Sequence, residues 1–292
     1  MAGHIAQRAD RGVIQASGAD AAKLLDSLIT QDMDLLRSQP AIHAGLLSPQ
    51  GKILFAFFVV SSGDDFLLDV AQDHAAALVK RLTMYKLRAA VQLTDLSAQM
   101  AVAVAWGAAP PAVPRGILSL PDPRHTDLGT RLLLPSGRLA ELGKCDADAN
   151  VYHAHRVGLG VPDEALDYPL GDTFPHEADF DLFNGASFTK GCYVGQEVVS
   201  RMQNKTVVRK RVVRISGDGL TTGGEIKHGD GVIGAIGSIA GNRALAMLRL
   251  DRASEAADKG EILTANGHAI SVDTVDLARF RDSLANKPVI DL

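Results

Sequence analysis

Val207-Val-Arg-Lys-Arg-Val-Val-Arg-Ile215 is rich in β-branched residues, and it begins a series of similar short segments near the end of the chain. Glycine or asparagine separates most of the segments that follow: Glu225–Lys227, Val232–Ile239, Ala244–Leu250, Glu261–Thr264 and Ala269–Val272. Short runs of this kind with turn residues between them are typical of antiparallel strands. The pattern predicts a small antiparallel β-barrel over residues 205–292. Three glycines within it, Gly231, Gly234 and Gly237, are predicted to lie at barrel corners.

The residues before the barrel alternate between strand and helix patterns. Gly12–Gly18 reads as a strand, and the leucines of residues 21–29 then recur at helical spacing. Lys52–Val60 is a nearly continuous apolar run, which predicts a buried strand in a hairpin with Phe66–Val70. Asp73–Met84 returns to helical spacing. We therefore predict a first domain of the α+β class over residues 1–204 and a second, the barrel, over residues 205–292.

Composition limits the compartment and the partners. The 292 residues are 46% hydrophobic and 22% charged, with a net charge of −4, which is ordinary for a globular protein and does not attract nucleic acid or an anionic membrane. We expect no direct nucleic-acid binding and no membrane contact. The only cysteines are Cys145 and Cys192, too few for a disulfide scaffold, and the first ten residues do not resemble a signal peptide. We therefore expect a cytoplasmic location.

One segment concentrates chemically reactive residues, namely Lys190-Gly-Cys-Tyr-Val-Gly-Gln-Glu197. Gly191 and Gly195 indicate a tight turn or the close approach of a ligand to the backbone. Lys190 would favour the Cys192 thiolate and Glu197 would oppose it, so the sequence leaves the direction of any shift open. The alternative is that Cys192 and Tyr193 are core residues, because unpaired cysteine is often buried.

Two further groups of polar residues have competing interpretations. Basic side chains gather in one stretch: Arg201, Lys205, Arg209, Lys210, Arg211 and Arg214. They form either a solvated strand face or a site for an anion, such as the carboxylate tail of a ligand or RNA. His153 and His155 would share one face of a strand, but no third ligand follows at zinc spacing. We predict no metal site.

The eight-residue motif resembles the signature of the YgfZ family of folate-binding proteins, which are relatives of the aminomethyltransferase (T protein) of glycine cleavage and serve iron–sulfur enzymes. The resemblance extends over most of the chain through other segments in the family's order: Leu28–Met33, Gly45–Phe55, Tyr85–Arg88, His155–Pro162 and Gly241–Met247. It implies a ring-like arrangement of an aminomethyltransferase-type body and a C-terminal barrel around a cavity that binds tetrahydrofolate.

The resemblance also implies roles for individual residues. The thiol of Cys192 would act as a redox group or a transient cluster ligand, supported by the rest of the motif: Lys190, Gly191, Tyr193, Gly195, Gln196 and Glu197. The candidate folate contacts are Tyr85, Arg88, Glu177, Tyr193 and Arg201. The implied function is a tetrahydrofolate-binding accessory protein for assembly or repair of iron–sulfur enzymes, including those that modify tRNA.

The second hypothesis is a folate-dependent one-carbon (aminomethyl) transferase. The T protein carries paired acids where this chain has Phe55 and Ala56, and another acid where this chain has Gly158. Neither an apolar side chain nor glycine can accept a proton or stabilise a cation. Transfer would then need a replacement acid such as Glu177, so whether the chain is an enzyme stays open and the accessory function is favoured.

Overall fold

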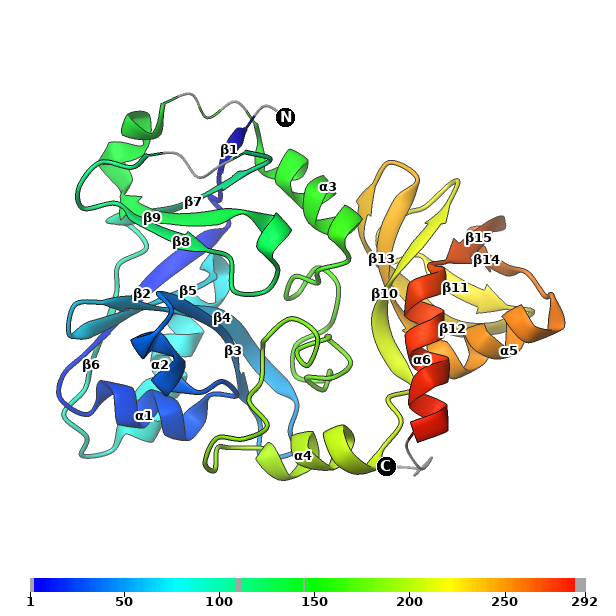
Figure 1. Ribbon diagram of the computed structural model, residues 1–292, viewed down its shortest axis with the longest axis horizontal. Helices are drawn as coiled ribbons and strands as arrows, with labels where there is room; N and C mark the ends of the chain where they lie inside the picture. Colours follow the sequence, from blue (N-terminus) through cyan, green and yellow to red (C-terminus); the bar gives the residue numbers. More distant parts are fainter. Residues whose placement is uncertain (1–2, 109–111, 144, 146, 287–292) are drawn as a thin grey trace. The chain divides into compact units, whose positions relative to one another are not determined.

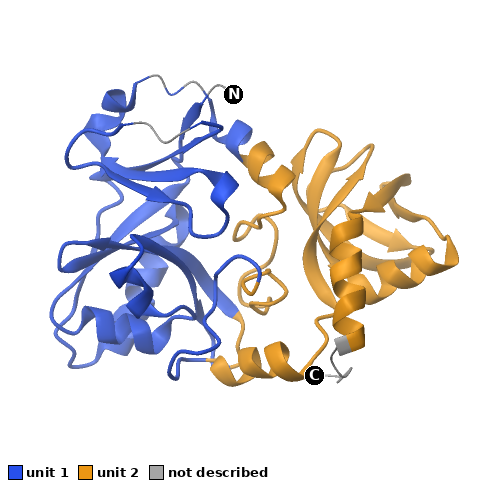
Figure 2. Cartoon of the chain, in the orientation of Figure 1, with its two compact units in different colours: residues 1–49, 53–152, 182–194 blue, residues 50–52, 153–181, 195–292 orange. Residues whose placement is uncertain are grey.

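The computed structural model describes residues 3–108, 112–143, 145 and 147–286. Its contacts divide the chain into two compact units (Figure 2). Unit 1 contains residues 1–49, 53–152 and 182–194, and unit 2 contains residues 50–52, 153–181 and 195–292. No described helix is long and apolar enough to cross a membrane.

Unit 1 contains a five-stranded antiparallel sheet with two helices (Figure 1). The strand order is β3 (Ala41–Leu47), β4 (Ile53–Ser62), β5 (Asp65–Ala71), β2 (Arg11–Ser17) and β6 (Gln92–Asp95). The helices α1 (Ala21–Leu28) and α2 (Ala75–Lys86) bury their leucines against this sheet, as their spacing predicted. The predicted hairpin is confirmed, because Phe57 of β4 pairs with Val70 of β5.

A second antiparallel sheet completes unit 1, in the order β1 (His4–Gln7), β7 (Met100–Trp106), β9 (Thr130–Pro135) and β8 (Leu118–Pro121). Short 3₁₀ turns join the elements of this unit at Met33–Arg37, Gln72–His74, Thr126–Leu128 and Ser136–Leu142.

A fully buried ion-pair group lies in this unit: Asp69 accepts hydrogen bonds from Arg11 and Arg131, and Arg131 also pairs with Asp122. Burial alone would raise the pKa of Asp69, but the two guanidinium groups outweigh burial and lower it.

Unit 2 contains the barrel, and the prediction of a closed antiparallel barrel is confirmed. Its strands close in the order β10 (Lys210–Gly217), β13 (Arg243–Arg249), β12 (Gly231–Ala240), β11 (Glu225–His228), β14 (Leu263–Ala265) and β15 (His268–Val272). Helix α4 (Gln196–Lys205) precedes the barrel, and α5 (Leu250–Lys259) and α6 (Thr274–Asn286) pack with its core. The chain between residues 160 and 195 contains no helix or strand beyond an isolated bridge.

Two local expectations have different outcomes. Two of the three glycines of β12 permit close packing, since a Cβ on Gly237 would lie 2.6 Å from the Asp167 carboxylate and one on Gly234 would lie 2.5 Å from the Met247 carbonyl oxygen. Their place at barrel corners stays a prediction. His153 and His155, which would share a face on a strand, lie in the helix α3 (Ala149–Leu159). Residues two apart on a helix do not share a face, so the two histidines cannot act together as that strand would allow.

Candidate functional site

Residues 184–187, which precede the motif Lys190–Glu197, are held within unit 1 by hydrogen bonds to the segment Leu28–Met33. Thr30 Oγ1 donates a hydrogen bond to the Gly185 carbonyl at 2.5 Å, and Gln31 Nε2 donates to the Asn184 carbonyl at 2.8 Å. The backbone N–H of Ser187 donates to the Thr30 carbonyl at 2.9 Å. Two stretches far apart in sequence therefore meet through polar groups that would otherwise be buried without partners.

Lys190 extends this attachment to the carboxyl end of α1. Its ammonium Nζ lies 2.6, 3.2 and 2.9 Å from the carbonyl oxygens of Asp26, Ile29 and Gln31, and 2.9 Å from Asp26 Oδ1. The side chain is only 2% exposed. The last carbonyls of a helix lack intrahelical partners and carry partial negative charge, so a buried cation satisfies them. Lys190 is thus an anchor of the motif, a role that the sequence did not indicate.

Cys192 lies between two buried anchors and is itself exposed. A Cβ on Gly191 would meet no atom within 4 Å, so the chain before the thiol is open. Tyr193 is 7% exposed, and burial raises its pKa to about 12. Its hydroxyl is buried and has no hydrogen-bond partner among the described residues. The alternative that Cys192 is a core residue is therefore wrong, whereas Tyr193 does belong to the core.

The remaining motif residues belong to unit 2. Gly195 takes a left-handed conformation (φ +81°) just before α4, where other residues would be strained. Gln196 and Glu197 begin the helix. Glu197 is 84% exposed, and it accepts a 3.0 Å hydrogen bond from Arg201 one turn later. The Glu197–Arg201 pair is thus a surface ion pair on α4.

The other expected folate contacts are dispersed. Tyr85 packs at the edge of the unit 1 core, and Arg88 is exposed just after α2. Glu177 lies in unit 2, where its carboxylate accepts a 2.9 Å hydrogen bond from the Phe174 N–H, and burial raises its pKa. Neither of the two pockets described below is lined by any of the expected folate contacts.

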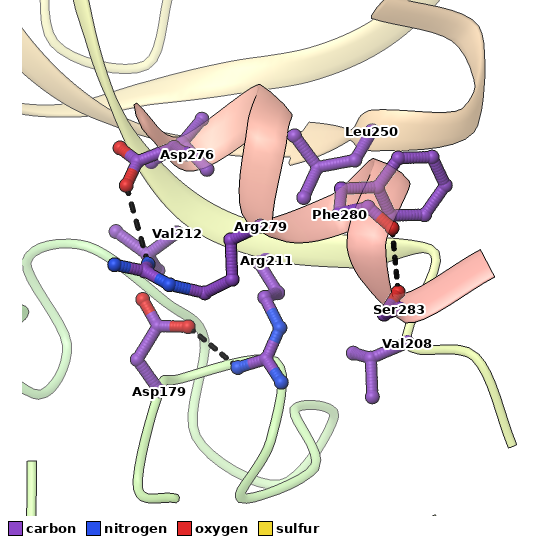
Figure 3. Close-up of a pocket in the computed structure, with 10 residues that line it drawn as sticks. Asp179, Val208, Arg211, Val212, Leu250, Asp276, Arg279, Phe280 and Ser283 are labelled. Carbon is purple, nitrogen blue, oxygen red and sulfur yellow. Dashed lines mark hydrogen bonds and ion pairs between the residues drawn. The ribbon is translucent and has the colours of Figure 1, made fainter. Parts of the chain in front are cut away.

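Arg211 organises the first pocket (Figure 3). Its guanidinium donates to Asp179 Oδ1 at 2.8 Å, to Asp181 Oδ2 at 2.7 Å and to the His176 carbonyl at 2.6 Å. The cavity beside these groups has a volume of about 50 Å³, room for little more than water, and Asp276 and Arg279 of α6 also line it. The interpretation of the basic stretch as a solvated face is therefore wrong for Arg211, which attaches the loop 174–181 to the barrel.

Asp179 should make stability depend on pH. It is buried with left-handed backbone (φ +58°), and burial outweighs Arg211, which is shared with Asp181, to raise its pKa to about 7. Between the ordinary pKa of 3.8 and about 7, the unfolded chain releases this proton while the folded chain keeps it, so rising pH favours unfolding. Over this pH range the free energy of unfolding falls by at most about 4 kcal/mol.

Urea unfolding of wild type and Asp179→Asn at several pH values measures this contribution. Buried His43, whose pKa is lowered to about 3, makes the free energy of unfolding rise with pH instead. This contribution is the same in both proteins, so it cancels when their stabilities are subtracted. Relative to wild type, the asparagine variant should gain stability as pH rises to about 7, while the control Glu141→Gln in unit 1, where Arg138 lowers the carboxyl pKa, should not. A pH-independent difference for Asp179→Asn would refute the assignment.

The second pocket lies wholly in unit 2 and has a volume of about 330 Å³. Its lining combines cationic, hydroxyl and apolar side chains: Val157, Gly158, Arg214, Ile215, Ser216, Arg243, Ala244, Val272 and Asp273. Arg214 pairs with Asp273 at 3.0 Å and lies 3.5 Å from Asp276, whereas exposed Arg243 has no ion-pair partner among the described residues. Such a pocket suits a small organic anion with an apolar body. The basic stretch indicated Arg214 as part of an anion site, but no sequence signal indicated Arg243.

Among the described residues, no group of three or more His, Cys, Asp or Glu side chains is arranged to hold a metal ion. Cys192 is therefore not part of such a group in the described part of the chain. Its exposure leaves it accessible to a group carried by another molecule.

Comparison with known proteins gives three findings. Residues 209–280 match the family described as CAF17, C-terminal beta-barrel domain. The chain is 31% identical over 274 residues to the human iron–sulfur cluster assembly factor IBA57, mitochondrial, covering 82% of this chain and 75% of that protein. It is 37% identical over 224 residues to the IBA57 homolog of Mycosarcoma maydis, covering 70% of this chain and 55% of that homolog.

The structural comparison agrees with the expected fold. The glycine cleavage system aminomethyltransferase T from Bartonella henselae superimposes with a TM-score of 0.72 at 15% identity, covering 94% of this chain and 86% of that one. The chain spans about half the length of the fungal homologs from Mycosarcoma maydis and Neurospora crassa. The prediction of a cytoplasmic location is contradicted, because the relatives are named mitochondrial proteins.

Proposed function

The chain belongs to the IBA57 family of iron–sulfur cluster assembly factors, which is related to YgfZ, and we propose that it acts in assembling or repairing iron–sulfur enzymes through Cys192. The observation that carries this proposal is an exposed thiol held between the buried side chains of Lys190 and Tyr193. A thiolate is a soft ligand for iron and a redox-active nucleophile.

The cluster would be shared with a partner protein. Iron–sulfur clusters usually take four thiolates, and the sequence contains only Cys145 and Cys192. On binding, Cys192 would lose its proton to solvent and donate one thiolate, while the partner supplies the remaining ligands. A single exposed ligand favours transient binding, which suits transfer or repair more than storage.

Genetic complementation tests this function. Cells that lack their own IBA57-type factor should regain the activity of iron–sulfur enzymes when they express this chain, while a dehydrogenase without a cluster serves as the unaffected control. Unchanged iron–sulfur activity despite normal levels of folded protein would refute the proposal.

We further propose reduced folate as the ligand, as the resemblance to the folate-binding family implies. The pocket of about 330 Å³ supports this, since Arg243 and Arg214 can pair with the carboxylates of a glutamate tail, and Val157 and Ile215 offer apolar contact. The contacts implied by the resemblance, namely Tyr85, Arg88, Glu177, Tyr193 and Arg201, stay predictions, and none of them lines this pocket.

Calorimetric titration with tetrahydrofolate tests the anion pocket. Arg243→Ala should weaken binding at least tenfold, roughly the effect of losing one charged hydrogen bond, and it should not lower stability because the side chain is exposed. Arg252→Ala on α5 is the matched surface control. With tetrahydropterin, which lacks the glutamate tail, wild type and Arg243→Ala should bind alike. Equal folate affinity in wild type and Arg243→Ala would exclude this pocket.

The alternative, folate-dependent aminomethyl transfer, lacks acids at the expected places. Phe55 and Ala56 are buried in β4, and Gly158 has no side chain. Burial raises the pKa of Glu177, and a carboxyl with a raised pKa can act as a general acid. This raised pKa is the observation that favours the alternative. A glycine-cleavage assay with lipoyl protein distinguishes the two functions, because only the transferase forms methylene-folate. We propose that any effect on tRNA modification passes through an iron–sulfur enzyme and needs no RNA contact.

A further inference from the structure

Apolar side chains are exposed at the carboxyl end of α2, the helix labelled in Figure 1. The opposite face of this helix packs Leu78 and Leu82 into the unit 1 core, where both are fully buried. Met84 is 63% exposed, and Leu87, three residues later, is 86% exposed. Both residues lie at the end of α2, three positions apart in the sequence, so this end of the helix presents an apolar spot to solvent.

Leu87 is held in a backbone conformation that leucine disfavours. Its dihedral angles are φ +45° and ψ −103°, and the N–H of Ala89 donates to the Lys86 carbonyl at 2.7 Å across the turn. These features resemble a type II′ turn, whose first central position is normally occupied by glycine. A strained residue that is also exposed gains nothing from core packing, and such strain is typical of functional sites.

Cationic side chains lie beside this spot in the sequence, and the acidic side chain hydrogen-bonded to the turn is that of Asp20, which accepts a 2.8 Å hydrogen bond from the Ala90 N–H. Lys80, Arg81 and Arg88 lie on the helix or directly after it, and none of them pairs with an acidic side chain in the described part of the chain. The sequence has no Asp or Glu between residues 74 and 94, although the whole chain carries a net charge of −4. The positive charge at the end of α2 is therefore local and uncompensated within the helix.

We propose that Lys80, Arg81, Met84, Leu87 and Arg88, here called the α2 patch, form a docking surface for a protein partner with an acidic rim around an apolar socket. Met84 and Leu87 would enter the socket, and the three cations would face the rim. Apolar anchors supply much of the affinity of such contacts, while complementary charges orient the partner and speed its association.

The same features disfavour other occupants. RNA recognition usually relies on exposed aromatic side chains that stack on bases, and the α2 patch contains none. An interfacial membrane helix needs a continuous exposed apolar face, but the apolar face of α2 is buried against the sheet. Charge complementarity around two flexible apolar side chains instead fits an acidic protein surface.

The test uses a fluorescent acidic peptide with leucines at helical spacing and glutamates elsewhere, and a control peptide with serine in place of leucine. Fluorescence anisotropy should show binding of the leucine peptide only, weakening as salt rises. Leu87→Ser and the double change Lys80→Glu with Arg81→Glu should each weaken binding at least tenfold, the usual effect of losing an interface anchor. The double change Lys205→Glu on α4 with Arg252→Glu on α5 makes the same charge change elsewhere and should bind like wild type.

Leu87→Gly separates docking from folding. Glycine relieves the strained turn, so its melting temperature should equal or exceed that of wild type, while peptide affinity falls as for Leu87→Ser. A lowered melting temperature would mean that Leu87 serves the fold and would overturn the proposal. Peptide binding that is unchanged by substitution of Leu87 would also overturn the proposal. The same holds if sedimentation experiments show that this patch binds tRNA, phosphatidylserine vesicles or a second copy of the chain.

Discussion

Cys192→Ser should abolish the ability of this chain to restore iron–sulfur enzyme activity in cells that lack their own factor, while leaving the fold intact. The thiol is exposed, so the substitution removes no core contact, and the free energy of unfolding should stay within about 0.5 kcal/mol of wild type. Serine keeps the size of the side chain but replaces a soft, acidic thiol with a hard hydroxyl that is not deprotonated near neutral pH.

Cys145 provides the matched control, because it is the only other cysteine and is also exposed. Cys145→Ser should restore enzyme activity fully. A thiol reagent should label two groups in native wild type and one in each serine variant. Full rescue by Cys192→Ser, at protein levels equal to wild type, would show that the thiol is dispensable and that the proposed role of the motif is wrong.

The sequence predicts the strands of the barrel and the sheet because the evidence for them is local. Val212, Val213 and Ile215 fall on a short apolar run with turn residues beyond it, and the structure buries all of them in β10. The helices α5 and α6 were not predicted. Of the residues that α5 buries only Leu250 is large and apolar, the others being Ala253, Ser254 and Ala256, so its hydrophobic pattern is weak.

Contacts between distant residues could not be predicted. Asp69 pairs with Arg11 and Arg131, which lie 58 and 62 residues away in sequence, and no spacing rule links them. Arg243 reaches the anion pocket because β13 pairs with β10, placing it opposite Ser216. The domain boundary expected between residues 204 and 205 stays a prediction. The two compact units each combine non-consecutive segments, so they do not correspond to a single cut in the chain.

The motif itself shows the same limit. That this segment is the functional site stays a prediction, and for Lys190 the sequence suggested only an effect on the neighbouring thiol. The structure instead directs the ammonium to the end of α1, some 160 residues earlier in the chain. A long, flexible cation suits this position, because its ammonium reaches three carbonyl oxygens and a carboxylate at once.

Lys190→Met should therefore destabilise the chain by about 3–4 kcal/mol, the largest loss expected for a single substitution in the motif. Methionine preserves the length and apolar stem, but it leaves the carbonyls of Asp26, Ile29 and Gln31 without their charged donor. Each hydrogen bond to a charged group is worth about 1.5–3 kcal/mol, and water can recover part of this at the half-exposed Asp26 carboxylate. Urea-induced unfolding measures the change.

Lys86→Met is the matched control, because the Lys86 ammonium donates to a single carbonyl, that of Val91, at 2.7 Å. It should lose only about 1.5 kcal/mol, the lower end of the range for one hydrogen bond to a charged group. If Lys190 anchors the motif, Lys190→Met should also speed hydrogen exchange in residues 21–31, change the rate at which Cys192 reacts with a thiol reagent, and reduce rescue of iron–sulfur enzymes. Lys86→Met should do none of these. A stability loss of Lys190→Met no larger than that of the control would show that the buried ammonium does not hold the thiol segment in place.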